Sequence, residues 1–456
     1  MKKIGRLRTY TSKEIENSYV SIGFECLDRD LFNPEKCYDL LAQSGVKYAR
    51  CQTGWAKCEK EKGVYDFAWL DSITDNLLAR GIIPWFCVGF GNPVYMPDVP
   101  NPTAVGCVPL YYGKETVDAW KNYVCTLAEH YKNCVQYYEI WNEPDVEHFW
   151  YPGKPDGSKY AELVNITAQA VHKSQPNAKI GAVVASQYNF YFIDTFLKNT
   201  KKENIDFFAY HIYTKFPELS YAPIMSHLRR RLDANGLSHV ELWQGESGYP
   251  SWAYKGHWLV EDGCNDERPQ AVFQLRRYFL DVYNGAKRSS FFQMADMWEK
   301  PYVKASEVIN KPAAHGILNG ITYTPKKSYE TIKYLAAIFS GDIMPAEEYI
   351  HVLIDTPSEA EQLSCETMTF VRNGTEVYAY YLPVSLDSKK NVHYKASVHI
   401  YKALENPILI DPYTGEVFDV CKDTNDLTSE EVYNELPIKD YPLILTGKKV
   451  FEIVCE

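Results

Sequence analysis

Three features are absent or scarce in the sequence, and each of them argues against one class of protein. No apolar run is long enough to cross a membrane, so no membrane-spanning helix is expected. The twelve cysteines are scattered, and even Cys51 and Cys58 are too far apart for a CxxC motif, which argues against structural zinc. Positive charge is scarce, since 48 Lys and Arg stand against 59 Asp and Glu for a formal net charge of −11. This balance disfavours nucleic acid or an anionic membrane as partner, and favours a neutral or cationic small ligand.

The first ten residues carry basic side chains but no apolar stretch behind them. A signal peptide needs both, so we expect a cytoplasmic protein whose thiols stay reduced. The chain has 456 residues, of which 46% are hydrophobic and 14% aromatic. This length and composition predict a globular protein with one large domain and a smaller one.

Short β-rich runs alternate with longer helical patterns through most of the chain, as in a parallel sheet with helical crossovers. Helical patterns cover residues 34–45, 67–80, 117–130 and 329–339, with Pro34 as a first-turn proline and Gly45 as a C-terminal cap. The predicted strands are residues 19–24, 46–50, 82–88, 136–141, 180–184, 207–213, 240–244 and 289–294. Eight such strands predict an α/β fold, a (β/α)8 TIM barrel over residues 14–341.

The loops after the third, fourth and seventh predicted strands are long and rich in Pro, Tyr and Trp, whereas the loops that lead into the strands are short. In a barrel this asymmetry marks the carboxyl ends of the strands as the functional face.

After Gly341 the pattern changes to strands alone, with turns at Asn373-Gly374 and Thr414-Gly415. The predicted strands are residues 376–382, 396–401, 407–411 and 441–446. They predict a smaller antiparallel β-sandwich domain over residues 342–456, which residues 1–13 are placed to complete.

Two glutamates follow strand-like runs of aromatic and aliphatic residues. Glu143 ends the fourth predicted strand, and Glu246 follows the seventh. Carboxyl ends of barrel strands converge on one pocket, and a buried carboxylate is costly unless it serves a purpose. Hydrolysis of a glycosidic bond uses two carboxyl groups, about 5 Å apart in the retaining mechanism, so the pair predicts that chemistry.

The segment Trp141-Asn142-Glu143-Pro144 resembles the acid/base motif of glycoside hydrolase clan A, whose members are retaining enzymes on an eight-stranded barrel. Residues 206–213, 291–299 and 314–319 are similar to family 39, which includes β-xylosidases, and so is the appended sandwich. The resemblance implies that Glu143 is the general acid/base, that Glu246 is the nucleophile and that Asn142 binds the sugar 2-hydroxyl. Two departures are the absence of a His after Arg50, and Gln244-Gly245 just ahead of Glu246.

The chemistry also predicts roles for neighbouring residues. An ionised nucleophile needs a cation or hydroxyl beside it, for which Arg50 and Tyr213 are the candidates. Glu143 must start protonated, which a dry aromatic setting and the charge of Glu246 would both promote. Tyr210 and His211 are candidates for binding sugar hydroxyls or for orienting Glu143.

Aromatic side chains are dense in the long loops, and flat rings suit the C–H faces of sugars. Trp298 is the preferred platform because it lies just past the eighth strand, with Asp296 and Glu299 able to hold hydroxyls, and Trp55 is a further candidate. The acidic run at residues 145–148 fits solvated or hydroxyl-binding side chains better than a metal site, so no metal and no cofactor are expected.

These observations predict a retaining glycoside hydrolase that acts, from chain ends, on a β-linked or equivalently oriented glycoside such as a xyloside. Two alternatives remain open, a carbohydrate-binding barrel without turnover and a transglycosylase using the same residues. The presence of both Glu143 and Glu246 argues against the first. The expected partner is a small-molecule or oligosaccharide substrate, and a homo-oligomer is compatible with the sequence.

Overall fold

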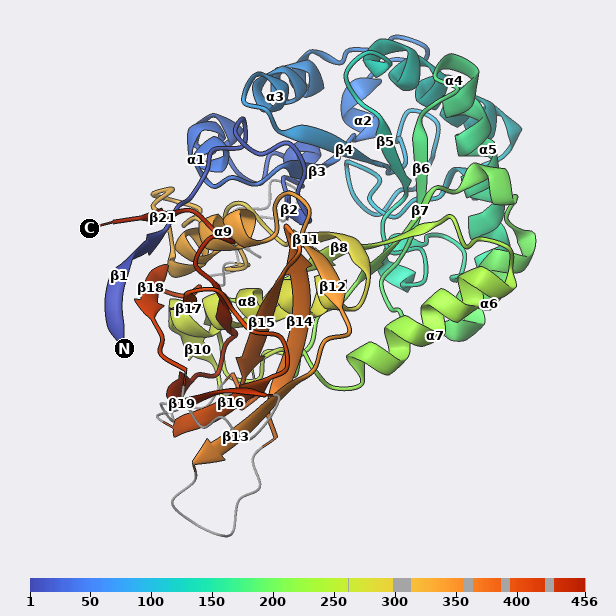
Figure 1. Ribbon diagram of the computed structural model, residues 1–456. Coiled ribbons are helices and arrows are strands. Elements are labelled where there is room, and N and C mark those ends of the chain that lie inside the picture. Colours follow the sequence, from blue (N-terminus) through green and yellow to red (C-terminus); the bar gives the residue numbers. More distant parts are fainter. Residues whose placement is uncertain (261, 298–312, 356–363, 387–393, 423–429, 456) are drawn as a thin grey trace.

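A closed barrel of eight parallel strands forms the first part of the chain, and antiparallel sheets form the last part (Figure 1). The computed structural model describes residues 1–260, 262–297, 313–355, 364–386, 394–422 and 430–455. The barrel strands are β2 (Val20–Gly23), β3 (Tyr48–Gln52), β4 (Ile83–Val88), β5 (Tyr137–Ile140), β6 (Lys179–Val184), β7 (Phe207–His211), β8 (Glu241–Ser247) and β11 (Ala286–Phe291). They pair in chain order, and β11 closes the ring between β8 and β2, which confirms the predicted fold.

Helices follow the strands and cover the outside of the barrel (Figure 1). They are α1 (Tyr38–Gln43), α2 (Trp55–Cys58), α3 (Ala68–Ala79), α4 (Lys114–Tyr131), α5 (Gly157–Ser174), α6 (Phe190–Asn199), α7 (Tyr221–Ala234), α8 (Glu267–Tyr283) and α9 (Lys327–Ile338). Asp156, Asn189 and Asp266 begin α5, α6 and α8 by accepting backbone N–H groups of the first turn. The predicted helix 34–45 is instead a 3-10 turn, Pro34–Lys36, followed by α1.

Large side chains fill the barrel near the end where its strands begin. Phe207 stacks on Trp243 with ring centroids 3.8 Å apart, and Trp85 meets Trp243 edge-on at 4.8 Å. The Arg288 guanidinium lies over the Tyr48 ring at 3.5 Å. The barrel is therefore a packed core, and the polar groups at its other end lie above an apolar floor.

The sandwich contains an eight-stranded and a three-stranded sheet. The larger sheet has the order β12-β14-β15-β20-β17-β18-β1-β21 and the smaller one β13-β16-β19. Their strands are β1 (Lys2–Leu7), β12 (Met344–Ala346), β13 (Ile350–Asp355), β14 (Glu366–Arg372), β15 (Thr375–Tyr381), β16 (Tyr394–Ile400), β17 (Pro407–Ile410), β18 (Glu416–Asp419), β19 (Glu431–Ile438), β20 (Leu443–Gly447) and β21 (Ile453–Val454). The amino-terminal strand β1 lies between β18 and β21.

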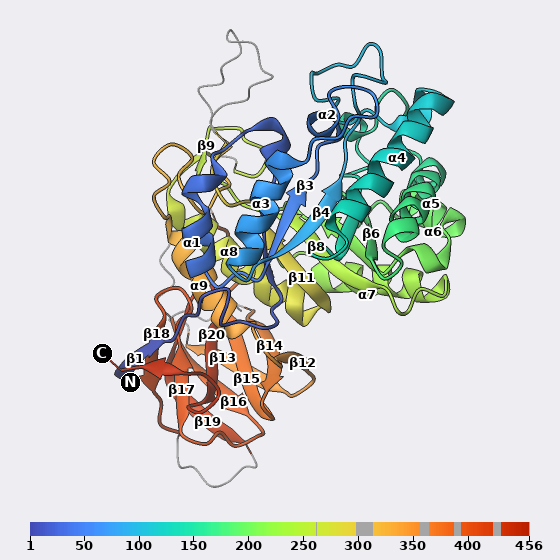
Figure 2. The same cartoon turned by 90° about the horizontal axis from the view of Figure 1, so that it is seen from above.

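The sandwich packs against helices α8 and α9, on the side of the barrel away from the tips of strands β3 and β4 (Figure 2). Arg268 on α8 donates two hydrogen bonds to Asp440, at 2.9 and 2.6 Å, and Arg276 reaches the Asp440 carbonyl at 2.6 Å. The rings of Phe279, Phe339 and Phe370 form an aromatic cluster at the same junction. This packing leaves the carboxyl ends of the barrel strands available for a site.

The long loop after β8 contains a short ladder, β9 (Trp252–Ala253) with β10 (Cys264–Asn265). Among the described residues, no helix combines the length and the apolar character that a membrane span requires.

Candidate active site

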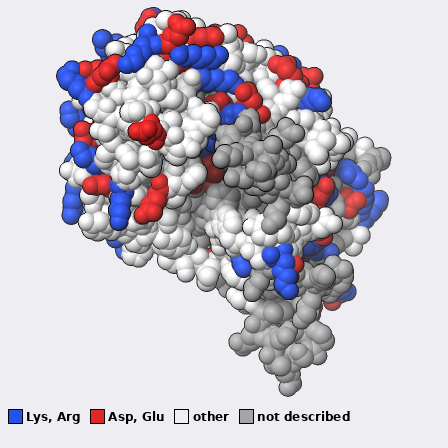
Figure 3. All heavy atoms as spheres, turned by 180° about the vertical axis from the view of Figure 1, so that it is seen from behind, with Lys and Arg blue, Asp and Glu red and all other residues white. Residues whose placement is uncertain are grey.

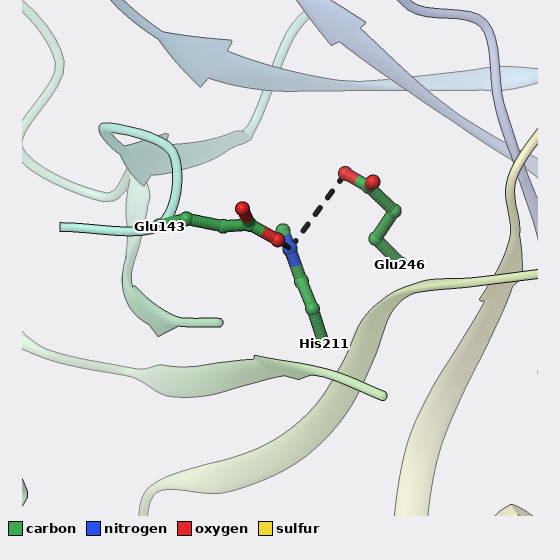
Figure 4. A group of neighbouring side chains, drawn as sticks. All are labelled: Glu143, His211 and Glu246. Atoms are coloured by element: carbon green, nitrogen blue, oxygen red, sulfur yellow. Dashed lines mark hydrogen bonds and ion pairs between the residues drawn. The ribbon is translucent and has the colours of Figure 1, made fainter. Parts of the chain in front are cut away.

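The two glutamates singled out from the sequence meet at the carboxyl end of the barrel. Glu143 follows β5, and Glu246 is the last but one residue of β8 rather than the residue after the strand. Oxygen atoms of both carboxyls and a ring nitrogen of His211 all lie within 4.8 Å of one another. Figure 4 shows the two carboxyls reaching toward each other from opposite sides of His211. Their side chains are only 16% and 12% exposed.

An unusual backbone turn directs Glu143 into the barrel mouth. Trp141 has a φ of 72° and Glu143 a φ of 44°, both in the left-handed region that non-glycine residues rarely adopt. Trp141 is fully buried, and its indole N–H donates to the Phe149 carbonyl at 2.7 Å. This anchoring holds the strained turn, and strain of this kind is typical of functional sites.

A bulge at Gly245 sets the direction of Glu246. In the pairing of β7 with β8, Tyr210 faces Gln244 but His211 faces Glu246, so Gly245 is skipped. A β-carbon at Gly245 would lie 3.1 Å from Nε2 of His211. Sterics therefore explain why glycine stands just before Glu246, because a side chain at position 245 would crowd His211.

Arg50 on β3 is the electrostatic centre of the site. It is fully buried and donates to Glu25 at 2.6 Å, to Asn142 at 2.9 Å and to Glu246 at 3.2 Å. It also donates to Glu139. A single guanidinium thus orients Glu246 from below and ties it to the segment that carries Glu143.

Tyr213 supplies the hydroxyl beside Glu246. Its O–H donates to Oε1 of Glu246 at 2.6 Å, while Arg50 contacts the other oxygen. Burial and the charge of Glu246 raise the pKa of Tyr213, so this donor keeps its proton. Both oxygens of Glu246 are therefore held, which fixes the plane of the carboxylate.

His211 contacts the other glutamate. Its Nδ1 lies 2.8 Å from Oε1 of Glu143, and its Nε2 has no hydrogen-bond partner among the described residues. Burial raises the pKa of Glu143 to about 7 and lowers the pKa of His211 to about 4. A neutral imidazole beside a carboxyl that titrates near pH 7 suits a proton donor, and the cause is burial rather than the charge of Glu246.

Two carboxylates and an imidazole are also a donor set that a divalent cation accepts. Arg50, however, places a permanent positive charge 3.2 Å from the same Glu246 carboxylate. The repulsion between that charge and a cation disfavours metal binding at this position.

Three residues proposed from the sequence lie elsewhere. Trp55 is fully buried, stacks on Tyr95 with ring centroids 5.5 Å apart and donates its indole N–H to Glu59, so it does not line the mouth. Asp296 is buried in an ion pair with Lys326 at 2.6 Å. Tyr210 bonds the Tyr221 hydroxyl in a buried network. Trp298 and Glu299 lie outside the described residues.

The sequence reasoning missed four polar or aromatic residues at the mouth. Glu25 and Glu139 hold Arg50, and Phe292 and His315 form ring contacts with Tyr213 at 6.4 and 6.2 Å. Glu139 did carry a signal, because it is a charged residue inside the apolar run of β5. Burial raises the pKa of Glu25 to about 8, although Arg50 lies beside it.

Asp145 was expected to be solvated or to bind hydroxyls, but it has a structural partner. Its carboxylate accepts the backbone N–H groups of Ala185 at 2.6 Å and Ser186 at 3.2 Å. It therefore binds the loop after β6 to the segment that carries Glu143.

Comparisons with known proteins agree with this architecture. Residues 35–241 match the family model described as glycosyl hydrolases family 39. The β-xylosidase of Geobacillus stearothermophilus is 26% identical over 170 residues, which cover 34% of this chain and 31% of that protein. The match thus spans about a third of the relative's length.

Solved structures share the fold along nearly the whole chain. A family 39 glycoside hydrolase from Bacteroides cellulosilyticus WH2 has a TM-score of 0.69 at 17% identity, covering 97% of this chain and 83% of that one. A GH39 β-xylosidase from Caulobacter crescentus has a TM-score of 0.56 at 17% identity, covering 97% and 98%.

Proposed function

From the relationship of this chain to the family 39 glycosyl hydrolases, we propose that it is a retaining glycoside hydrolase with Glu246 as nucleophile and Glu143 as general acid/base. The observation that carries the proposal is the separation of the two carboxyls, whose nearest oxygens lie within 4.8 Å. A separation of about 5 Å lets one carboxylate attack the sugar directly, whereas an inverting enzyme needs more room for a water molecule.

The reaction proceeds in two steps. Glu246 attacks the anomeric carbon while Glu143 transfers its proton to the glycosidic oxygen, so that the C–O bond breaks and the leaving group departs as an alcohol. Glu143, now a carboxylate, removes a proton from water, and the resulting hydroxide displaces Glu246 from the sugar. Arg50 and Tyr213 hold the nucleophile for the first step, and His211 holds Glu143 for both.

The proposed substrate is a neutral β-glycoside such as a β-xyloside. Seen from behind, the molecule has a broad uncharged area, with Lys, Arg, Asp and Glu gathered mainly along its edge (Figure 3). The described lining of the cavity beside the two carboxyls likewise has no charged side chain of Asp, Glu, Lys or Arg other than Glu143 and Glu246, which suits a neutral sugar. Asn142, held by Arg50, is proposed to bind the 2-hydroxyl, and Phe292 offers a half-buried ring face beside Tyr213. The long loops around the mouth favour removal of terminal sugars.

Substitution of Glu246 tests the nucleophile. Glu246→Gly should abolish hydrolysis of aryl glycosides, and added azide should restore turnover to a glycosyl azide of inverted configuration. Glu241→Gly, at the other end of β8, is the matched control and should keep the wild-type rate. Hydrolysis by Glu246→Gly without azide would exclude the assignment.

Substitution of Glu143 tests the acid/base separately. Glu143→Ala should spare substrates with good leaving groups far more than unactivated glycosides, because only the latter need a proton. Equal losses on both would count against Glu143.

The two alternative functions are separated by product analysis. A panel of aryl glycosides of xylose, glucose, galactose, mannose, fucose and arabinose in both anomers identifies the sugar. Binding without turnover on every member would favour a carbohydrate-binding barrel. Transfer to added sugar in preference to water would favour a transglycosylase.

A further inference from the structure

The loop between β7 and α7 carries Tyr213 and is fastened to the β-sandwich a few residues later. Phe216 and Leu219 of this loop are 51% and 67% exposed, so they do little to hold it in place. The Glu218 side chain, by contrast, is only 12% exposed. The Tyr381 hydroxyl, on sandwich strand β15, donates to Oε1 of Glu218 at 2.8 Å. One acidic residue therefore joins this loop of the barrel mouth to the second domain.

Tyr381 is a rigid partner for that contact. It is fully buried, and the guanidinium of Arg276 on α8 lies over its ring at 5.4 Å. Arg276 also lies 3.7 Å from the same Glu218 oxygen, and it donates to the carbonyls of Leu382 and Val384 just after β15. Burial and the charge of Glu218 raise the pKa of Tyr381, so the hydroxyl keeps the proton that it donates.

The segment between this anchor and Tyr213 is short and internally bonded. The Thr214 hydroxyl donates to the Phe216 carbonyl at 3.2 Å and accepts the Phe216 N–H at 3.1 Å, which makes a tight turn. Arg277 of α8 donates to the following carbonyl, that of Pro217, at 3.2 Å. The loop is thus held jointly by the barrel and the sandwich, and loss of the sandwich bond would loosen it without releasing it.

The position of Tyr213 matters because its hydroxyl donates to Glu246 at 2.6 Å. The other contacts of this side chain are ring contacts, with Trp258, His315 and Phe292 at centroid distances of 5.6, 6.2 and 6.4 Å. Such contacts tolerate small shifts, whereas a hydrogen bond at 2.6 Å does not. A small displacement of the loop would therefore act first on the bond to the nucleophile.

We propose that the β-sandwich supports the reaction from a distance, with Tyr381 and Glu218 as positioning residues that hold the Tyr213 hydroxyl against Glu246. The inference rests on the proposed function and adds a role for the second domain. Neither positioning residue has a bond to the Glu246 carboxyl among the described residues, so both act through the loop.

The test is a double-mutant cycle, measured as kcat/KM on the aryl glycoside that the panel identifies. Tyr381→Phe removes the hydroxyl and keeps the ring, and it should lower kcat/KM by at least about threefold in the wild-type background. In the Tyr213→Phe background the same change should cost less than about 1.5-fold, because the bond that Tyr381 positions is already absent. A residue that merely stabilised the sandwich would cause the same loss in both backgrounds.

Tyr380→Phe is the matched control. Tyr380 is the neighbouring buried residue of β15, and its hydroxyl donates to the Pro437 carbonyl at 3.1 Å within the sandwich. It should keep kcat/KM in both backgrounds. Glu218→Gln retains an acceptor for Tyr381 and should keep most of the rate, whereas Glu218→Leu should reproduce the loss and supplies the same cycle if Tyr381→Phe fails to fold.

Equal fold losses from Tyr381→Phe in the two backgrounds, a wild-type rate in Tyr381→Phe, or a matching loss in Tyr380→Phe would overturn the inference. Each of these outcomes leaves the proposed function standing, since the wild-type protein still turns over the glycoside. No turnover of any aryl glycoside by the wild-type protein would instead refute the proposed function, and the inference with it.

Discussion

Replacement of Tyr213 by Phe isolates one hydrogen bond to the proposed nucleophile. The hydroxyl donates to Glu246 at 2.6 Å in a buried setting, and Arg50 stays on the other carboxylate oxygen. A hydrogen bond to a charged group contributes about 1.5–3 kcal/mol, which corresponds to about 10- to 150-fold in rate when that bond holds the carboxylate in position for attack. We therefore expect kcat/KM at neutral pH to fall by a factor in that range.

The measurement is kcat/KM on an aryl glycoside at neutral pH. Tyr210→Phe, on strand β7 just before Tyr213, is the control, because the Tyr210 hydroxyl bonds Tyr221 at 2.6 Å and not Glu246. Wild-type kcat/KM in Tyr213→Phe, or an equal loss in Tyr210→Phe, would refute the reasoning.

Three further predictions concern the acid/base, the buried cation and the bulge. Burial raises the pKa of Glu143 to about 7, and Glu143 must be protonated to act as the acid. Wild-type activity should therefore be present below pH 7 and lost as the pH rises through 7, and Glu143→Gln should not show this loss at high pH on a substrate with a good leaving group. Arg50→Met leaves Glu139 buried without its ion-pair partner and should lower the free energy of unfolding in urea by about 3–5 kcal/mol, whereas Arg80→Met, which breaks a more exposed pair with Asp39, should change it by about 1 kcal/mol or less. Gly245→Ala places a β-carbon 3.1 Å from His211, so it should lower kcat and reduce the free energy of unfolding by about 1–3 kcal/mol. A wild-type kcat in this variant would show that His211 can move aside without affecting the reaction.

The eight barrel strands could be predicted because they are short β-rich runs that alternate with longer helical patterns. Since parallel strands end on one face, the same reasoning predicted that Glu143, Glu246, Arg50 and Tyr213 would meet, and they do. The resemblance to family 39 is likewise confirmed by the match of residues 35–241.

The sequence could not predict which partners the side chains on long loops would pack against. Trp55 and Asp296 have the right chemistry for a sugar site. Trp55, however, packs in an aromatic cluster, and Asp296 pairs with Lys326, 30 residues further along the chain.

The place of β1 in the sandwich has a consequence for synthesis. Lys2 pairs with Asp419 and Arg6 with Val454, so β1 can enter its sheet only after these distant residues of the chain have been synthesised. The barrel is contiguous and can close in the meantime, while β1 remains an unpaired edge. Lys2, Lys3 and Arg6 place positive charge along that edge, which is how proteins discourage edge-to-edge association. The sandwich therefore cannot be completed before the barrel segment that lies between β1 and its partners has been synthesised.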